Sequence, residues 1–226
     1  MTNPWLRRTF VAAPVLLLVG VVALKFGWKG HPDLDWPTAL TVWTVAHGGY
    51  VLGNLGLGVV LAALWSRSRR AARTTPERIG VDVVGVAGVL GTVAILGQMV
   101  IDLIVGFRAD SRAGMGPISK SIHDLPGFEA FFYGVVPMLG MAAIAVLLLH
   151  LAVRREVLAW AALLYLAGSL TIATQVAWPM VLGGVAVAIA LIAVSRPTAR
   201  YVDPHGLHAL GASGGLPRAG SGVHQR

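Results

Sequence analysis

Residues 37–65 read PTALTVWTVAHGGYVLGNLGLGVVLAALW and contain no Asp, Glu, Lys or Arg. Such a run can cross a hydrocarbon core of about 30 Å as a helix, because each helical residue rises about 1.5 Å. Comparable apolar runs recur along the chain. The six predicted spans are 10–26, 37–65, 79–107, 128–153, 157–172 and 179–195. The sequence therefore predicts an all-α, polytopic transmembrane helical bundle, a multi-pass protein of the cell membrane in contact with membrane lipids.

The composition of the whole chain agrees with this class. Of its 226 residues, 56% are hydrophobic and only 12% are charged, about half the charged share of an average soluble domain. The chain has no cysteine, which excludes disulfides, thiolate nucleophiles and Cys-ligated metals. It also lacks a phosphate-binding loop and a His-Glu-x-x-His zinc motif. We therefore expect neither a metal nor a cofactor.

The basic residues indicate an orientation. The net charge of +8 comes from Lys and Arg in short segments beside the predicted spans, where topology and anionic lipid head groups explain them better than nucleic acid does. Thirteen of the 18 lie on one side of the predicted bundle: Arg7, Arg8, Arg67, Arg69, Arg70, Arg73, Arg78, Arg154, Arg155, Arg196, Arg200, Arg218 and Arg226. By the positive-inside rule, both termini are predicted to be cytoplasmic.

The chain divides into two regions by composition. Residues 1–196 hold all the apolar runs and are predicted to form the transmembrane helical bundle. Residues 197–226 are rich in Gly, Ser and Pro. A segment of this kind buries too little apolar surface to fold, so it is predicted to be a disordered cytoplasmic tail.

A polar stripe interrupts the second predicted span. Trp43, His47, Tyr50 and Asn54 are spaced by four, three and four residues, which places them on one face of a helix. Because polar groups facing lipid are costly, this face should point into the bundle. Hydrogen bonds to neighbouring helices are a sufficient explanation for Tyr50 and Asn54. His47 lies deep in its span and is a candidate functional residue.

Glycines line the same helix. Gly49 and Gly53 form a Gly-x-x-x-Gly pattern, followed by Gly56 and Gly58. Small residues at this spacing let a second helix approach closely. That second helix can belong to the same chain or to another copy, so a homo-oligomer through glycine faces is a further expectation.

Two acids lie in the outer halves of the third and fourth predicted spans. Gln98 and Asp102 share one helical face, and Glu129 and Tyr133 share another, each pair being four residues apart. An ionisable group within a span is a functional candidate by default. Asp102 can also be read as an acid hydrated through a shallow crevice. Glu129 can be read as a carboxylate stabilised by the dipole at a helix N-terminus.

Other features near the spans have simpler interpretations. Asp82 is predicted to pair with a nearby arginine such as Arg78, and His150 to stabilise a helix C-terminus. Pro137 should kink the fourth span. The outer segment before that span is about twenty residues long, a length that suggests a lid or binding loop.

These residues allow three functions. In the first, an intramembrane enzyme protonates or isomerises a lipid-soluble, isoprenoid-like small molecule. Asp102 or Glu129 would then be the catalytic acid and His47 the proton acceptor. The substrate-binding residues would be Trp43, Tyr50, Asn54, Gln98 and Tyr133. In the second, the chain is a small proton- or cation-linked transporter, sensor or accessory subunit without catalysis. In the third, it only associates with partner helices.

The sequence also resembles known membrane proteins. The stretch AHGGYVLGNLGLG, the arginine-rich segment after it and the stretch GQMVIDLIVGF look like those of small six-span bacterial membrane proteins of unassigned function. The size of the chain and its acids at outer span positions are similar to those of integral-membrane terpene cyclases. The second resemblance implies proton-initiated cyclisation of a prenyl chain.

Overall fold

The computed structural model describes residues 3–196, and every regular element in this range is a helix. In chain order the elements are α1 (Pro4–Val22), the π-helix η1 (Ala23–Trp28), α2 (Trp36–Ala71), α3 (Thr75–Arg108), α4 (Met115–His123), α5 (Phe128–Phe132), α6 (Met138–Val153), α7 (Ala159–Ala173) and α8 (Ala177–Ser195). The predicted all-α class is confirmed. The predicted disordered tail, 197–226, lies outside the described residues.

Among residues 3–196, four helical segments are long and apolar enough to cross a membrane: Pro4–Trp28, Trp36–Ala71, Thr75–Arg108 and Ala177–Ser195. Two further apolar helices, α6 and α7, have 16 and 15 residues. At about 1.5 Å per residue they are roughly 24 and 22 Å long, shorter than a typical hydrocarbon core. The helices are those of an integral membrane protein by length and composition, and the count of six spans stays a prediction.

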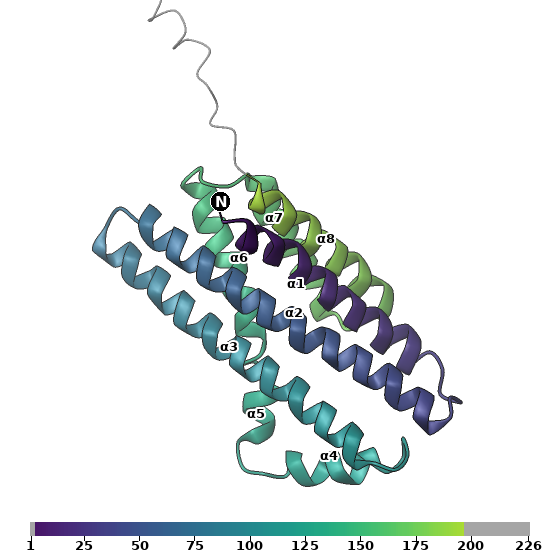
Figure 1. Ribbon diagram of the computed structural model, residues 1–226. Coiled ribbons are helices and arrows are strands. Elements are labelled where there is room, and N and C mark those ends of the chain that lie inside the picture. The colour runs from purple at the N-terminus through teal and green to yellow at the C-terminus, as the bar shows by residue number, and fades with distance from the viewer. Residues whose placement is uncertain (1–2, 197–226) are drawn as a thin grey trace, which may run out of the picture.

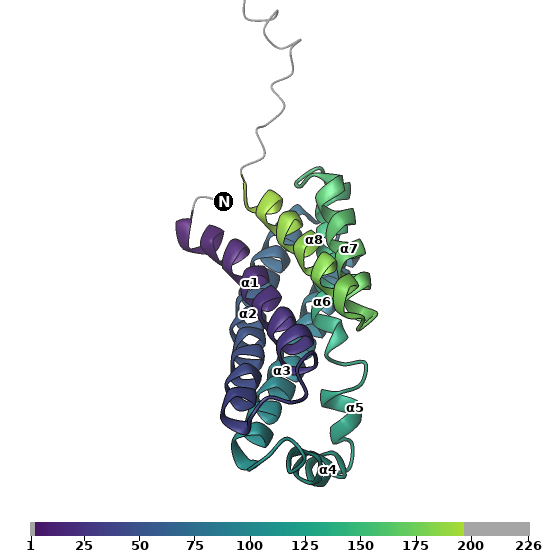
Figure 2. The same cartoon turned by 90° about the vertical axis from the view of Figure 1, so that its right-hand side faces the viewer.

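The two longest helices, α2 and α3, form an antiparallel pair that runs the length of the molecule (Figure 1). Helix α1 packs along α2 and on α8, while α6 packs on α3, α2 and α7. The main core lies among these helices and includes Phe10, Leu61, Leu148, Tyr165 and Leu191. The short helices α4 and α5 lie at the other end of α3, away from α7 and α8 (Figure 2). This second end holds the candidate site.

Glycines hold α1 and α2 together. A Cβ atom added to Gly49 would lie 2.9 Å from the carbonyl oxygen of Leu16, and one added to Gly20 would lie 2.8 Å from that of Ala46. The Gly-x-x-x-Gly surface of α2 is therefore covered by α1 of the same chain. A homo-oligomer, which stays an expectation, would need a different surface.

The predicted fourth span, 128–153, is wrong as a continuous helix. Helix α5 ends at Phe132, and α6 begins at Met138 after the N-cap residue Pro137. Proline lacks an amide hydrogen and disfavours helical geometry in the residue before it, so the predicted kink is a complete break. Tyr133 lies in this break.

The outer segment that was predicted as a loop contains a helix. Met115 of α4 is buried, and Ile118 and Ile122 pack against the same apolar cluster, which includes Val105 of α3 and Trp28. These positions are three and four residues apart, so they form one apolar face of a short amphipathic helix.

Ion pairs connect the helices at the end of the molecule that carries Arg69 and Arg154, which we call the arginine-rich end. Glu77 at the start of α3 accepts hydrogen bonds from Arg154 and, at 2.7 Å, lies against His150 Nε2. Asp82 accepts from the Trp65 indole at 2.9 Å and pairs with Arg69 at 3.4 Å. The predicted partner of Asp82 was an arginine such as Arg78, and in the structure that arginine is Arg69.

Candidate functional site

Three polar side chains from three segments meet near the end of α3. His47 Nε2 on α2 lies 3.7 Å from Asp102 Oδ2 on α3. The hydroxyl of Tyr133, from the break between α5 and α6, donates a hydrogen bond to Asp102 Oδ1 at 2.7 Å. His47 is buried, and the Asp102 side chain is 19% exposed. We call His47, Asp102 and Tyr133 the polar triad.

The second nitrogen of His47 determines how the ring can carry protons. His47 Nδ1 lies 2.9 Å from the backbone carbonyl oxygen of Trp43. A carbonyl oxygen only accepts hydrogen bonds, so Nδ1 must carry a hydrogen. Nε2 then presents to Asp102 either a lone pair or a second N–H. The 3.7 Å separation between Nε2 and Oδ2 is longer than a hydrogen bond, but it is short enough for the charge of each group to affect protonation of the other.

Trp43 fixes the spacing of α2 and α3 at the triad. Its indole Nε1 donates to the backbone carbonyl oxygen of Asp102 at 2.9 Å. Its ring stacks on His47 with centroids 3.9 Å apart. Gly106 makes room for it, because a Cβ atom there would lie 2.6 Å from Trp43 Nε1. Trp43 therefore contacts both members of the His47–Asp102 pair.

Aromatic and basic side chains extend the cluster in two directions. On one side Trp28 packs on Trp43 at 4.7 Å, and the Arg112 guanidinium lies 4.0 Å from the Trp28 ring. Arg112 also donates to the backbone carbonyls of Trp28 and His31 at 3.2 Å. On the other side the His123 ring lies 4.2 Å from that of Tyr133. The triad is thereby connected to residues beyond the long helices.

Sequence reasoning did not place Trp28 and Arg112 in this cluster. Trp28 is the last residue of η1, Arg112 lies between α3 and α4, and the two are separated by 84 positions in the chain. A cation beside an indole is visible only after folding, since nothing in either local pattern indicates the other.

Five of the eight predicted site residues lie outside the polar triad, namely Trp43, whose contacts are given above, and Tyr50, Asn54, Gln98 and Glu129. The Tyr50 ring lies 6.3 Å from that of His47. Asn54 is buried and donates at 2.9 Å to the Tyr50 carbonyl of its own helix, as the packing interpretation expected. Gln98 is half-buried on α3. Glu129 is exposed in the first turn of α5. Of the two predicted acids, only Asp102 lies beside His47.

Within residues 3–196, no three His, Asp or Glu side chains gather in an arrangement for a metal ion. Two grooves with volumes of about 730 and 480 Å³ are lined by residues 62–78 and 79–90. Both lie toward the opposite end of α2 and α3 from Asp102.

Comparison of the chain with family models, with curated proteins and with solved structures found no match. The functional assignment therefore depends on the residues of this chain alone.

Proposed function

We propose that this chain is a multi-pass membrane protein with a proton-binding site in its outer half, and that it acts in proton-linked transport or proton sensing. The polar triad would hold the proton. In this proposal all six apolar helices cross the membrane and both termini are cytoplasmic.

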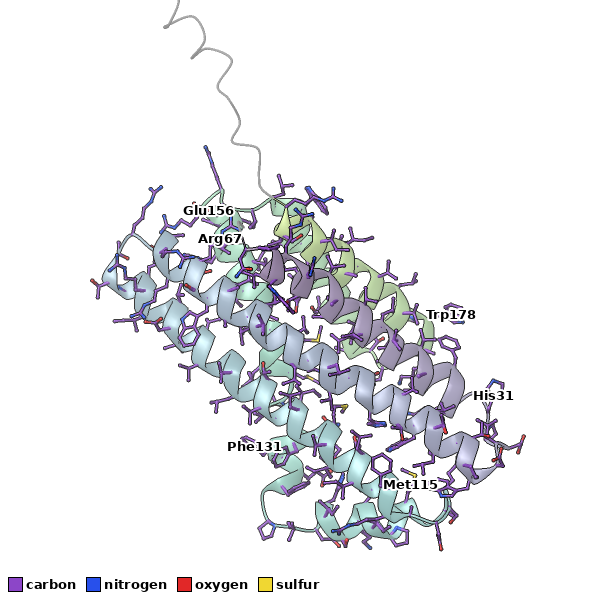
Figure 3. All side chains as sticks on the ribbon, in the orientation of Figure 1. His31, Arg67, Met115, Phe131, Glu156 and Trp178 are labelled. Atoms are coloured by element: carbon purple, nitrogen blue, oxygen red, sulfur yellow. The ribbon has the colours of Figure 1, made fainter. Side chains whose placement is uncertain are left out.

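The distribution of charge supports this orientation. Arg67 and Glu156 lie at one end of the molecule, while His31 and Met115 lie at the other (Figure 3). The end with Arg67 also carries Arg154 and most of the other basic residues of the described chain. Basic residues are enriched on the cytoplasmic side of membrane proteins, so the triad falls on the outer side.

The observation that carries the proposal is the contact between His47 Nε2 and Asp102 Oδ2 at 3.7 Å. With Nδ1 committed to the Trp43 carbonyl, a proton can occupy either Nε2 or the carboxyl group. Ionisable groups within spans are expensive and pair with one another along ion and proton pathways. The pair therefore fits a site that takes up and releases one proton.

Tyr133 and His123 give this site a connection to the outer surface. Tyr133 bonds to the Asp102 carboxylate, and its ring packs on that of His123 at the end of α4. Asp102 lies six residues before the last residue of α3, Arg108, so it is about 9 Å from the helix end. A proton would enter along the side chains of these residues.

The general-acid enzyme stays a prediction. Conversion of an isoprenoid-like molecule needs a chamber beside the acid, of the order of 300 Å³ or more. Both grooves described above lie toward the arginine-rich end, away from Asp102. We favour proton binding because it uses directly the proximity of His47 and Asp102.

Infrared difference spectroscopy of the full chain in lipid nanodiscs tests the proposal. We expect a pH-dependent carboxyl band in the wild type that is absent in Asp102→Asn and altered in His47→Gln. Glu129→Gln is the matched control, because Glu129 is an exposed acid outside the triad, and it should leave this band in place. A spectrum that is identical in the wild type and in Asp102→Asn would overturn the proposal.

Liposomes loaded with a pH-sensitive dye separate the two activities. If the chain is a transporter, the wild type should collapse an imposed pH difference faster than Asp102→Asn does. If it is a sensor, the wild type should show the carboxyl band without proton flux.

A further inference from the structure

Two adjoining grooves run along α2 and α3 at the arginine-rich end. The first, of about 730 Å³, is lined by Trp65, Ser66, Arg69, Arg70 and Arg78 together with Ala62. The second, of about 480 Å³, follows α3 from Ile79 to Leu90. They meet where Asp82, which lines the second groove, accepts a hydrogen bond from the Trp65 indole, which lines the first. We call them the basic groove and the apolar groove.

The basic groove carries excess positive charge. It is lined by three arginines and no acid within the described residues, and only Arg69 of the three is paired with a carboxylate, that of Asp82 at 3.4 Å. Arg70 is held by a 2.6 Å hydrogen bond to Ser66 Oγ. The charges of Arg70 and Arg78 are thus left to attract an anion. Planar guanidinium groups match the geometry of phosphate oxygens, with which they form paired hydrogen bonds.

The apolar groove continues from this charge into the hydrophobic part of the helix. Ile79, Val83, Val86 and Leu90 are spaced by four, three and four residues, so they share one face of α3. Each of the four is about half exposed or more, from 49% to 63%. The eleven helical steps from Ile79 to Leu90 rise about 16 Å, which is close to half of a hydrocarbon core about 30 Å thick.

We infer that the two grooves together bind an anionic phospholipid. Its phosphate would lie between Arg70 and Arg78, and one acyl chain would follow the apolar groove from Ile79 to Leu90. The positive charges of Arg70 and Arg78 favour an anionic head group. The apolar groove beside them favours a lipid with an acyl chain over a free phosphate ion. Trp65 lies between the two grooves, where amphipathic rings favour the membrane interface. The inference rests on the membrane embedding proposed above and not on the polar triad.

Native mass spectrometry of the detergent-solubilised full chain measures this binding directly. The probes are dioleoyl phosphatidylglycerol, dioleoyl phosphatidylcholine and inorganic phosphate. We expect the phosphatidylglycerol to bind more tightly than the other two. The double variant Arg70→Gln/Arg78→Gln should weaken its apparent affinity about 25-fold, because each basic residue near a lipid surface contributes about fivefold. Arg69 is left in place because it neutralises Asp82.

The matched control is Arg7→Gln/Arg8→Gln, which removes the same charge from exposed positions at the start of α1. This variant should change the affinity for phosphatidylglycerol less than twofold. Equal losses in the two double variants would mean that only the net charge matters, and would overturn the inference.

Two further outcomes decide the source of the ligand. Equal binding of phosphatidylglycerol and phosphatidylcholine, or full competition by inorganic phosphate, would also overturn the inference. A wild-type chain that stays soluble without detergent would instead contradict the membrane embedding, so the two failures can be told apart.

Discussion

Gly106 shows how one missing side chain positions the candidate site. The Trp43 indole lies on the backbone of α3 at this residue, donates to the Asp102 carbonyl and stacks on His47. Any side chain at position 106 would push the indole away and separate α2 from α3 at the triad. The distance between His47 and Asp102 therefore depends on a residue that carries no polar group.

Gly106→Ala should destabilise the protein by about 1–3 kcal/mol, the usual range for overpacking a buried contact. Gly80→Ala in the same helix is the control, because a Cβ atom there meets nothing within 4 Å. Thermal unfolding of both variants in one detergent makes the comparison. Equal unfolding temperatures would contradict the contact with Trp43.

Asp35 should make the stability of the first turn of α2 depend on pH, and this effect does not involve the polar triad. It is the N-cap of α2, and its hydrogen bonds with Thr38 hold the pKa of this carboxyl below its usual range. A lowered pKa in the folded state means that the cap is fully effective above about pH 4 and weakens as pH falls through the lowered pKa. In Asp35→Ala, the Thr38 amide should exchange its hydrogen faster at neutral pH. This difference from the wild type should shrink in acid, and a difference that is constant with pH would argue against the cap.

At the scale of elements, long apolar runs were predictable and short or interrupted helices were not. Helices α1, α2, α3 and α8 follow from apolar runs that are long enough to cross a membrane. Helix α4 has nine residues, and its apolar face depends on packing against Trp28 and Val105. The sequence predicted only a kink at Pro137, where the structure has a break between α5 and α6. This break brings Tyr133 to Asp102. Such contacts depend on tertiary packing, which local patterns do not encode.

The contact between α1 and α2 gives a test at this scale. Gly49→Leu should destabilise the fold by about 3 kcal/mol or more, because the new side chain meets the backbone of α1 at Leu16. Gly48→Leu is the control, since a Cβ atom at Gly48 meets nothing within 4 Å. Unfolding in mixed detergent micelles compares the two. Similar stability would place the packing surface elsewhere.

At the scale of the whole molecule, the proposal of six crossings depends on the short helices α6 and α7. The chain has no cysteine, so single introduced cysteines report their side of the membrane without background. We expect Ala113→Cys and Thr174→Cys to react with an impermeant maleimide on intact cells. Thr74→Cys and Leu158→Cys should react only after permeabilisation. Labelling of Leu158→Cys on intact cells would mean that α6 does not cross.

The central claim is that the His47–Asp102 pair takes up and releases one proton, which can occupy either side chain. The most direct measurement is nitrogen-15 nuclear magnetic resonance of the membrane-embedded full chain, with the His47 signals assigned by their loss in His47→Gln. We expect Nδ1 to stay protonated across the pH range, and Nε2 to gain and lose a proton in a step that shifts in Asp102→Asn. Titration of His47 that is the same with and without the Asp102 carboxylate would contradict the claim.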